Sequence, residues 1–453
     1  MIGWGWVILV GRWVSSAGLL GGILAFLIGG LLCVLVGLTY AEMSSSLPLA
    51  GGELVYSYRG LGYTSSWVTG WAIGFAYLSV CAFETVAITT ALNFLLPLPQ
   101  IVHLWDISGS PVYLSWASIG VFFAVLVGYL NYKGVKFSGR FQVFATMSLL
   151  IVGIVTVLGG VSLGSIEYTR PVFTGTAGLV SVMMMTPFMF VGFDVIPQAA
   201  EEVNVPYRAL GQILVFSILM AVLWYVLMMV AVAFAAPAEV RDVGTIPLAE
   251  AIAYAFNNSW AGKIVVVAGL CGILTSWNGF VVGGSRVIFA MGRAKMLPAA
   301  FGQVHPTYGT PHMAILLITV LSIIAPFFGR TAIIWFVDAG AFGTVIAYLM
   351  VAASFVVLRK KEPELDRPYT VGGGITIGVL AVAAALFFLT LYLPGGAGAL
   401  GTPEWLLVGF WSALGAVLFL WARTSYGAVT KQEREMLIFG KEFARSRYLG
   451  KSM

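Results

Sequence analysis

Apolar blocks of membrane-spanning length dominate this chain and decide which folds are open to it. Of its 453 residues, 60% are hydrophobic and only 9% are charged, whereas soluble domains carry about 25% charged residues. A helix crosses a bilayer core with about 20 apolar residues, and only helices or closed barrels satisfy every backbone hydrogen bond there. The pattern therefore predicts an all-α, polytopic membrane protein. Its eleven blocks cover residues 19–40, 67–96, 112–130, 141–163, 179–200, 210–236, 264–291, 313–328, 333–358, 375–393 and 405–421.

A shorter apolar stretch, residues 2–10, opens the chain. It is too short to cross a bilayer alone, and it lacks the basic start of a signal peptide. If it forms the outer end of a first span, five of the 24 lysines and arginines fall outside and nineteen fall inside. This bias predicts about twelve spans in a plasma or inner membrane, with both termini in the cytoplasm. The five outer residues are Arg12, Arg170, Arg241, Lys263 and Arg330.

Two stretches are poorly suited to a continuous helix. The first is Gly3-Trp4-Gly5 in the opening span, because glycine destabilises a helix interior. The second runs from Pro187 to Pro197, where two prolines bracket a glycine and a carboxylate at membrane depth. Helix interruptions at matching positions in two halves of a chain are typical of a transporter's substrate site. Packing glycines and ordinary proline kinks are the alternative interpretation.

Three carboxylates lie within the apolar blocks, without a lysine or arginine at the same depth. An unpaired charge there is costly, so such a group faces a cavity, carries a proton or binds a cation. Asp194, beside the second interruption, is the strongest functional candidate, and Glu84 is a candidate proton carrier. A carboxylic acid hydrogen-bonded to a neighbouring helix is the alternative for Glu84. Asp338 lies near the end of its block, which favours a helix cap.

Other chemistry has little support in the sequence. The three cysteines lie in apolar blocks and the three histidines are scattered, so no metal-ligand spacing is present. No catalytic cluster or cofactor motif is visible, and we expect neither an enzyme nor a bound cofactor. The net charge of +5 fits basic cytoplasmic loops rather than nucleic-acid binding.

Two loop motifs carry a family resemblance. The first is Tyr40-Ala41-Glu42-Met43 with Leu47-Pro48 and Ala50-Gly51-Gly52-Glu53, and the second begins with Gly283-Gly284-Ser285-Arg286. Together with Phe190-Val191-Gly192-Phe193-Asp194 and Ala200-Glu201-Glu202-Val203, they resemble the amino acid–polyamine–organocation (APC) superfamily of permeases. The resemblance implies a leucine-transporter-type fold of two inverted five-helix repeats, with helices 1 and 6 broken. It implies repeats at residues 1–165 and 177–360, two further spans at 374–423 and a basic tail at 424–453.

The resemblance also implies a site. By it, the backbone amides of the first interruption bind a substrate carboxylate and the second interruption receives the amino group, with Phe193 as a gate. The residues concerned are Ile2, Gly3, Trp4, Gly5, Phe190, Val191, Gly192, Phe193 and Asp194. Trp4 departs from the small residue usual between the glycines, and the half-helix usual before them is almost missing, which predicts an incomplete first helix.

The resemblance also raises the question of which ion, if any, is coupled to substrate transport. Some sodium-independent members carry a lysine in the fifth span, but residues 141–163 contain none. Thr275, Ser276 or Ser285 could supply oxygens to sodium, although hydroxyl-to-carbonyl bonding within the helix is the simpler expectation. Proton coupling through Glu84 or Asp194, or substrate exchange, is preferred. The loop at 96–112 has no cysteine, so a disulfide-linked heavy chain is not expected.

The sequence thus predicts a secondary transporter that moves amino acids by alternating access, with membrane lipid and substrate as its partners. A polyamine or small-amine permease is one alternative. A transport-inactive membrane sensor or scaffold is the other.

Overall fold

Helices account for nearly all of the regular structure. The computed structural model describes residues 2–134, 139–198, 200, 206–241 and 244–440. Within these residues, ten helical segments are long and apolar enough to cross a membrane. They are α2 (Val10–Ser46), α4 (Tyr63–Leu95), α5 (Leu114–Tyr132), α6 (Gly139–Leu163), α7 with α8 (Thr176–Phe190 and Val195–Gln198), α9 (Tyr207–Ala235), α12 (Ser259–Arg293), α14 (Ala332–Lys361), α15 (Ile375–Tyr392) and α16 (Thr402–Ser425).

Shorter elements complete the described part of the chain. The remaining α-helices are α1 (Gly5–Ile8), α3 (Glu53–Leu61), α10 (Ala238–Arg241), α11 (Pro247–Ala255), α13 (His312–Ile324) and α17 (Lys431–Phe439). Of the 3₁₀ turns, those that lie wholly within the described residues are η1 (Ile166–Thr169), η3 (Ala299–Gly302) and η4 (Ala325–Phe328). Two strands, β1 (His103–Ile107) and β2 (Ser110–Tyr113), form an antiparallel hairpin between α4 and α5. The hairpin was not part of the all-α prediction, and Ser108 and Gly109, both with positive φ, form its tight turn.

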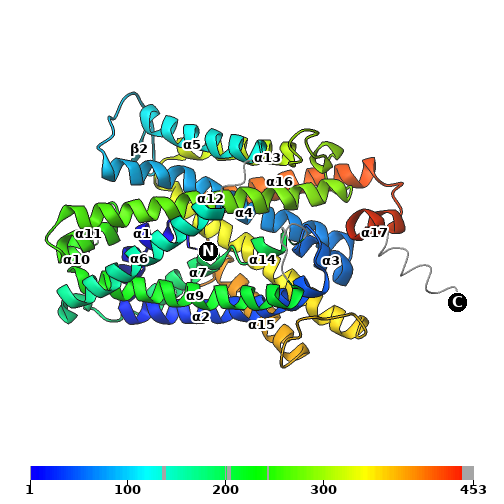
Figure 1. Ribbon diagram of the computed structural model, residues 1–453, viewed down its shortest axis with the longest axis horizontal. Coiled ribbons are helices and arrows are strands. Elements are labelled where there is room, and N and C mark those ends of the chain that lie inside the picture. The colour runs from blue at the N-terminus through cyan, green and yellow to red at the C-terminus, as the bar shows by residue number, and fades with distance from the viewer. Residues whose placement is uncertain (1, 135–138, 199, 201–205, 242–243, 441–453) are drawn as a thin grey trace.

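The helices lie side by side along one long axis. Figure 1 shows α10 and α11 at one end of this bundle and α3 and α17 at the other, with the start of the chain in the middle. Large apolar side chains on the outer helices are exposed, among them Phe144 of α6 and Phe410 of α16. Because no aqueous surface of this size and apolarity is stable, the outer surface faces lipid. The protein is therefore a multi-pass membrane protein.

The described chain has ten long helices, and the predicted count of about twelve spans also includes two shorter helical pieces. The opening stretch does not form a separate long helix but joins the next block within α2, across a kink at Gly18. Residues 313–328 form only the short α13, followed by η4 with Pro326. In both places the helix is shorter than its apolar block, because a glycine or a proline ends it. The apolar pattern alone does not show where such a helix ends.

The kink at Gly18 reverses the chain. Its φ of 72° and ψ of 168° are non-helical, and a Cβ here would lie 2.7 Å from the backbone nitrogen of Phe173. The rings of Trp13 and Phe26 are 4.5 Å apart across it, although thirteen residues of straight helix would separate them by about 20 Å. The residues before Gly18 therefore form a short helical piece that folds back on the rest of α2.

Candidate functional site

A small cavity lies where the start of the chain meets α4, α7, α9 and α12. Its volume is about 30 Å³, roughly the share of one molecule in liquid water. Its walls are mainly aromatic and apolar, with backbone and a few polar groups exposed between them. The lining residues are Gly3, Trp4, Gly5, Val80, Phe83, Glu84, Phe188, Met189, Val191, Tyr225, Ser276 and Phe280.

Glu84 supplies the carboxyl group of this cavity. It comes from the middle of α4 and is 1% exposed. The hydroxyl of Ser276 on α12 donates to Glu84 Oε1, and Glu84 Oε2 has no hydrogen-bond partner among the described residues. A Cβ on Gly3 would lie 2.8 Å from both Glu84 Oε1 and Ser276 Oγ. The backbone at residue 3 therefore touches the carboxyl group only because it carries no side chain.

Two glycines on α12 make room for the start of the chain. A Cβ on Gly272 would lie 2.6 Å from the Gly3 carbonyl oxygen, and a Cβ on Gly269 would lie 2.6 Å from Cε3 of the Trp4 ring. These glycines are three residues apart and so share one helix face. The large ring of Trp4, fully buried, packs against α12 at this face.

The polypeptide leaves helical geometry between α7 and α8. Val191 is extended, with φ −56° and ψ 140°, and Gly192 has a φ of 126°, which glycine alone adopts readily. Pro187, in contrast, lies inside α7 without ending it. Its missing N–H would have bonded the Met183 carbonyl, and the Thr186 hydroxyl donates to that oxygen instead, at 2.7 Å. The expectation that Pro187 bounds the non-helical stretch is therefore wrong.

The side chain of Asp194 accepts a hydrogen bond from the backbone of this non-helical stretch. Its side chain is completely buried, and Oδ1 accepts a hydrogen bond of 2.6 Å from the backbone N–H of Gly192. Asp194 Oδ2 has no hydrogen-bond partner among the described residues. One carboxylate oxygen thus stabilises the local backbone, and the other can accept a further hydrogen bond.

The expected site residues fall into three places. Gly3, Trp4, Gly5 and Val191 line the small cavity with Glu84. Ile2, Gly192 and Phe193 line a larger cavity of about 800 Å³, between α6, α9 and α12, which Ser276 also borders. Phe190 and Asp194 line neither cavity. Phe190 packs on Phe26 and Tyr225, and Phe193 packs between the rings of Tyr40 and Tyr348.

Comparison with known proteins decides the family. The family model described as "Amino acid permease" matches residues 1–418. The chain belongs to the amino acid permease family. This places it in the APC superfamily, as the loop motifs indicated, and makes it a membrane permease.

Curated relatives match most of this permease at low identity. The branched-chain amino acid permease BcaP of Bacillus subtilis (strain 168) is 26% identical over 436 residues, covering 93% of this chain and 90% of the relative. The methylthioribose transporter of the same organism is 26% identical, with 88% and 86% covered. Its aspartate-proton symporter is 25% identical, with 86% and 76% covered.

A further buried carboxyl group in the permease, besides those of Glu84 and Asp194, escaped the sequence prediction. Glu53, at the start of α3, is completely buried and accepts a hydrogen bond from the side-chain amide of Gln198 on α8. Burial raises the pKa of Glu53 well above its usual range, and the nearby Asp194 carboxylate adds to the rise. Glu53 is the last residue of the motif Ala50-Gly51-Gly52-Glu53. The sequence of this motif is typical of a loop and therefore does not predict a buried carboxyl group there.

An ion-pair network lies at the end of the bundle that carries α3. Glu42 is buried and pairs with Arg359 and Arg367, the latter at 3.0 Å. Arg59 pairs with Glu362 at 2.6 Å. These pairs join α2 and α3 to the end of α14, so they tie together segments that are distant in sequence.

The hydroxyl groups of α12 mostly bond their own helix. Thr275 Oγ1 donates to the Cys271 carbonyl at 2.9 Å, and Ser285 Oγ donates to the Val282 carbonyl at 3.0 Å.

Asp338 is the seventh residue of α14 and lies beyond its first turn, so the prediction of a helix cap is wrong. The predicted motif residues 201–203 lie outside the described residues.

Several lining residues were also missed. Val80, Phe83, Phe188, Met189, Tyr225 and Phe280 surround the small cavity. In the sequence they are ordinary apolar or aromatic members of membrane-length blocks, and nothing in their spacing separates them from lipid-facing neighbours.

Proposed function

We propose that this permease is a secondary transporter that moves an amino acid across the membrane by alternating access. Its substrate site is the region of the small cavity, between Gly3-Trp4-Gly5 and the Phe190–Asp194 stretch. The observation that carries the proposal is the meeting of Gly3, Val191, Glu84 and Ser276 around one cavity at the centre of the bundle. Backbone released from helical hydrogen bonding at membrane depth needs polar partners, and a zwitterion offers them at both ends.

The site changes size during transport. A cavity of about 30 Å³ holds about one water molecule and is too small for any amino acid. The larger cavity, which reaches Ile2, Gly192 and Ser276, lies beside the site and is the proposed route for the substrate. Phe193, packed between two tyrosine rings at the edge of that route, is the gate.

Protons are the proposed coupling ions. Glu84 has one oxygen bonded to Ser276 and the other without a described partner, an arrangement in which a proton can be gained or lost. Asp194 has a similar half-satisfied carboxylate. One relative is an aspartate-proton symporter, which supports the same choice. Exchange of substrates and coupling to sodium are the competing modes.

The architecture proposed for this site is the inverted repeat. Residues 1–165 and 177–360 form the two repeats, with 374–423 as two added spans, 424–453 as a basic tail and both termini in the cytoplasm. In support, the non-helical stretches before α1 and after α7 approach the same cavity. The end of the bundle with α3 and α17 then faces the cytoplasm.

A thermal-shift screen tests the substrate class. Purified protein is heated with each of a panel of L-amino acids, their D-enantiomers, polyamines and methylthioribose. A ligand that binds the folded state at 100 times its Kd stabilises it by about 2.7 kcal/mol, so we expect one or more L-amino acids to raise the unfolding midpoint. A rise with polyamines or methylthioribose alone would contradict an amino acid site.

A further inference from the structure

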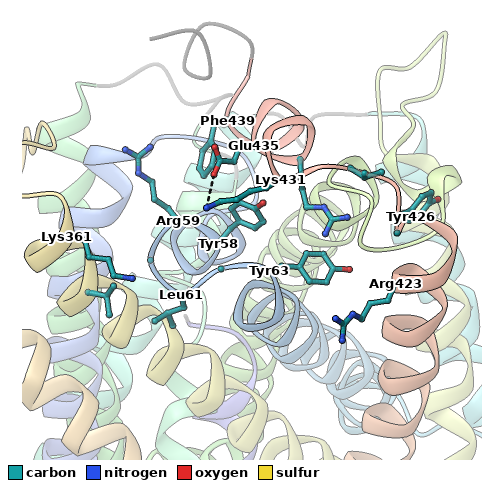
Figure 2. A pocket seen from close by; sticks show the side chains of 16 residues that line it. Tyr58, Arg59, Leu61, Tyr63, Lys361, Arg423, Tyr426, Lys431, Glu435 and Phe439 are labelled. Atoms are coloured by element: carbon teal, nitrogen blue, oxygen red, sulfur yellow. Dashed lines mark ion pairs between the residues drawn. The ribbon is translucent and has the colours of Figure 1, made fainter. Parts of the chain in front are cut away.

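A basic cavity lies at the end of the bundle that carries α3 and α17. It has a volume of about 750 Å³ and lies between the α3–α4 turn, the ends of α14 and α16, and α17. Among its sixteen lining residues, five are cationic and one, Glu435, is acidic. Figure 2 shows these side chains around the cavity, with Lys431 paired to Glu435. The five cationic residues are Arg59, Lys361, Arg423, Lys431 and Arg434.

Aromatic rings hold two of the arginines at its edge. The Arg434 guanidinium lies 4.2 Å from the centre of the Tyr63 ring, and the Arg423 guanidinium lies 5.7 Å from that of Phe419. Arg434 Nε is buried and has no hydrogen-bond partner among the described residues. A buried donor without an acceptor is costly, and an anionic ligand in the cavity would supply one.

The N-terminus of α4 adds to the positive potential. This 33-residue helix begins at Tyr63, and its N-cap residue, Gly62, has no side chain that could cap the first N–H groups. Gly62 and Tyr63 both line the cavity. The first N–H groups of a helix have no partner within it and favour negative charge. Together with the Arg423 and Arg434 guanidinium groups, they suit a phosphate group.

An apolar groove lies beside this cavity, along the membrane-spanning helices. It lies between α4, α14 and α16, has a volume of about 320 Å³, and is lined by Thr64, Phe75 and Phe419 among others. The ring of Tyr63, which lines the cavity, stacks at 5.9 Å on the ring of Phe419, which lines the groove. From Thr64 to Phe75, α4 rises about 16 Å, close to half of the roughly 30 Å hydrocarbon core.

We propose that the cavity and the groove together bind one anionic phospholipid. The phosphate lies among the arginines and the α4 N-terminus, and an acyl chain occupies the groove over the depth of one leaflet. Basic pockets between membrane-spanning helices recognise lipid headgroups in this way. A soluble phosphate ester shares the headgroup chemistry, but it would leave the apolar groove unused. The site is separate from the proposed substrate cavity and does not depend on transport.

Lipid titration of the full-length protein tests this site. Unfolding midpoints are measured in detergent with phosphatidylglycerol, with phosphatidylcholine and with inorganic phosphate. We expect only phosphatidylglycerol to raise the midpoint strongly. An arginine near an anionic lipid strengthens binding roughly fivefold, so Arg423→Gln/Arg434→Gln should weaken phosphatidylglycerol binding about 25-fold.

A neighbouring lysine provides the matched control. Lys360 adjoins Lys361 and is likewise exposed, but it does not line the cavity, so Lys360→Gln should bind as the wild type does. An equal loss in Lys360→Gln would show only general attraction to a basic surface and overturn the proposal. So would an equal effect of phosphatidylcholine, or a full effect of inorganic phosphate alone.

A variant in the groove tests the acyl chain independently of the arginines. Ala416 of α16 lines the groove, and Ala416→Phe would fill it. This variant should bind long-chain phosphatidylglycerol more weakly than the wild type, and dihexanoyl phosphatidylglycerol as well as the wild type does. Unchanged binding of the long-chain lipid would overturn the assignment of the groove.

Discussion

Gly3 is a residue of the proposed site that tolerates little change, because its neighbours leave no room for a side chain. Its backbone lies against the Glu84 carboxyl group, the Ser276 hydroxyl and α12, and each contact needs the absence of a side chain at residue 3 or at Gly272. The sequence indicated the glycines and Glu84 separately. It could not show that they meet, because the contact joins the start of the chain to helices more than 70 residues away.

Gly3→Ala should therefore damage the site. The added Cβ would lie 2.8 Å from two polar atoms, and overpacking of this kind costs about 1–3 kcal/mol. We expect a lower unfolding midpoint and weaker substrate binding in the thermal-shift assay. Gly74→Ala is the control, since a Cβ there meets no atom within 4 Å and should be neutral or slightly stabilising. Equal effects of the two changes would contradict the close approach at Gly3.

Glu84→Gln should separate proton coupling from substrate movement. Glutamine keeps the size of the side chain and can still accept from Ser276, but it cannot carry a proton. Uptake driven by a pH gradient should be lost while counterflow exchange persists. Asp338→Asn is a control carboxyl change inside another apolar helix, away from the cavity. Unchanged pH dependence in Glu84→Gln would remove Glu84 from coupling.

At the scale of elements, α7 shows what the sequence could and could not predict. The motif around Gly192 and Asp194 marked the right segment. Pro187 was expected to bound the non-helical stretch, yet the Thr186 hydroxyl takes over the hydrogen bond that the proline removes, and the helix continues to Phe190. Proline removes one donor, and whether a neighbour replaces it depends on a side-chain rotamer that no spacing rule reveals.

Gly192→Ala should disturb the chain between α7 and α8. With φ at 126°, a side chain here forces a sparsely populated conformation that costs about 1–3 kcal/mol. Gly175, with φ 119° and open space around it, gives a control with similar strain outside the cavities. Both alanine variants should lose stability in thermal unfolding, but only Gly192→Ala should lose substrate binding at temperatures where it remains folded. Retained binding in Gly192→Ala would contradict a role for this backbone in the site.

At the scale of the whole molecule, composition and block length predicted most of the fold. Each long helix coincides with an apolar block, because the cost of exposing backbone to lipid fixes helices wherever such blocks occur. The helix lengths were less predictable, since the kink at Gly18 ends the first helical piece and Pro326 shortens another helix. The aromatic walls of the small cavity could not be predicted, because inward-facing and lipid-facing aromatic residues look alike in a fully apolar helix.

Uptake into proteoliposomes tests the central claim most directly. Protein reconstituted into vesicles is given a panel of radiolabelled amino acids with and without an imposed pH gradient. We expect saturable uptake of at least one L-amino acid, competed by its L- but not its D-form, increased by the gradient and abolished by a protonophore. Folded, reconstituted protein that takes up no amino acid from the panel would contradict the proposed function.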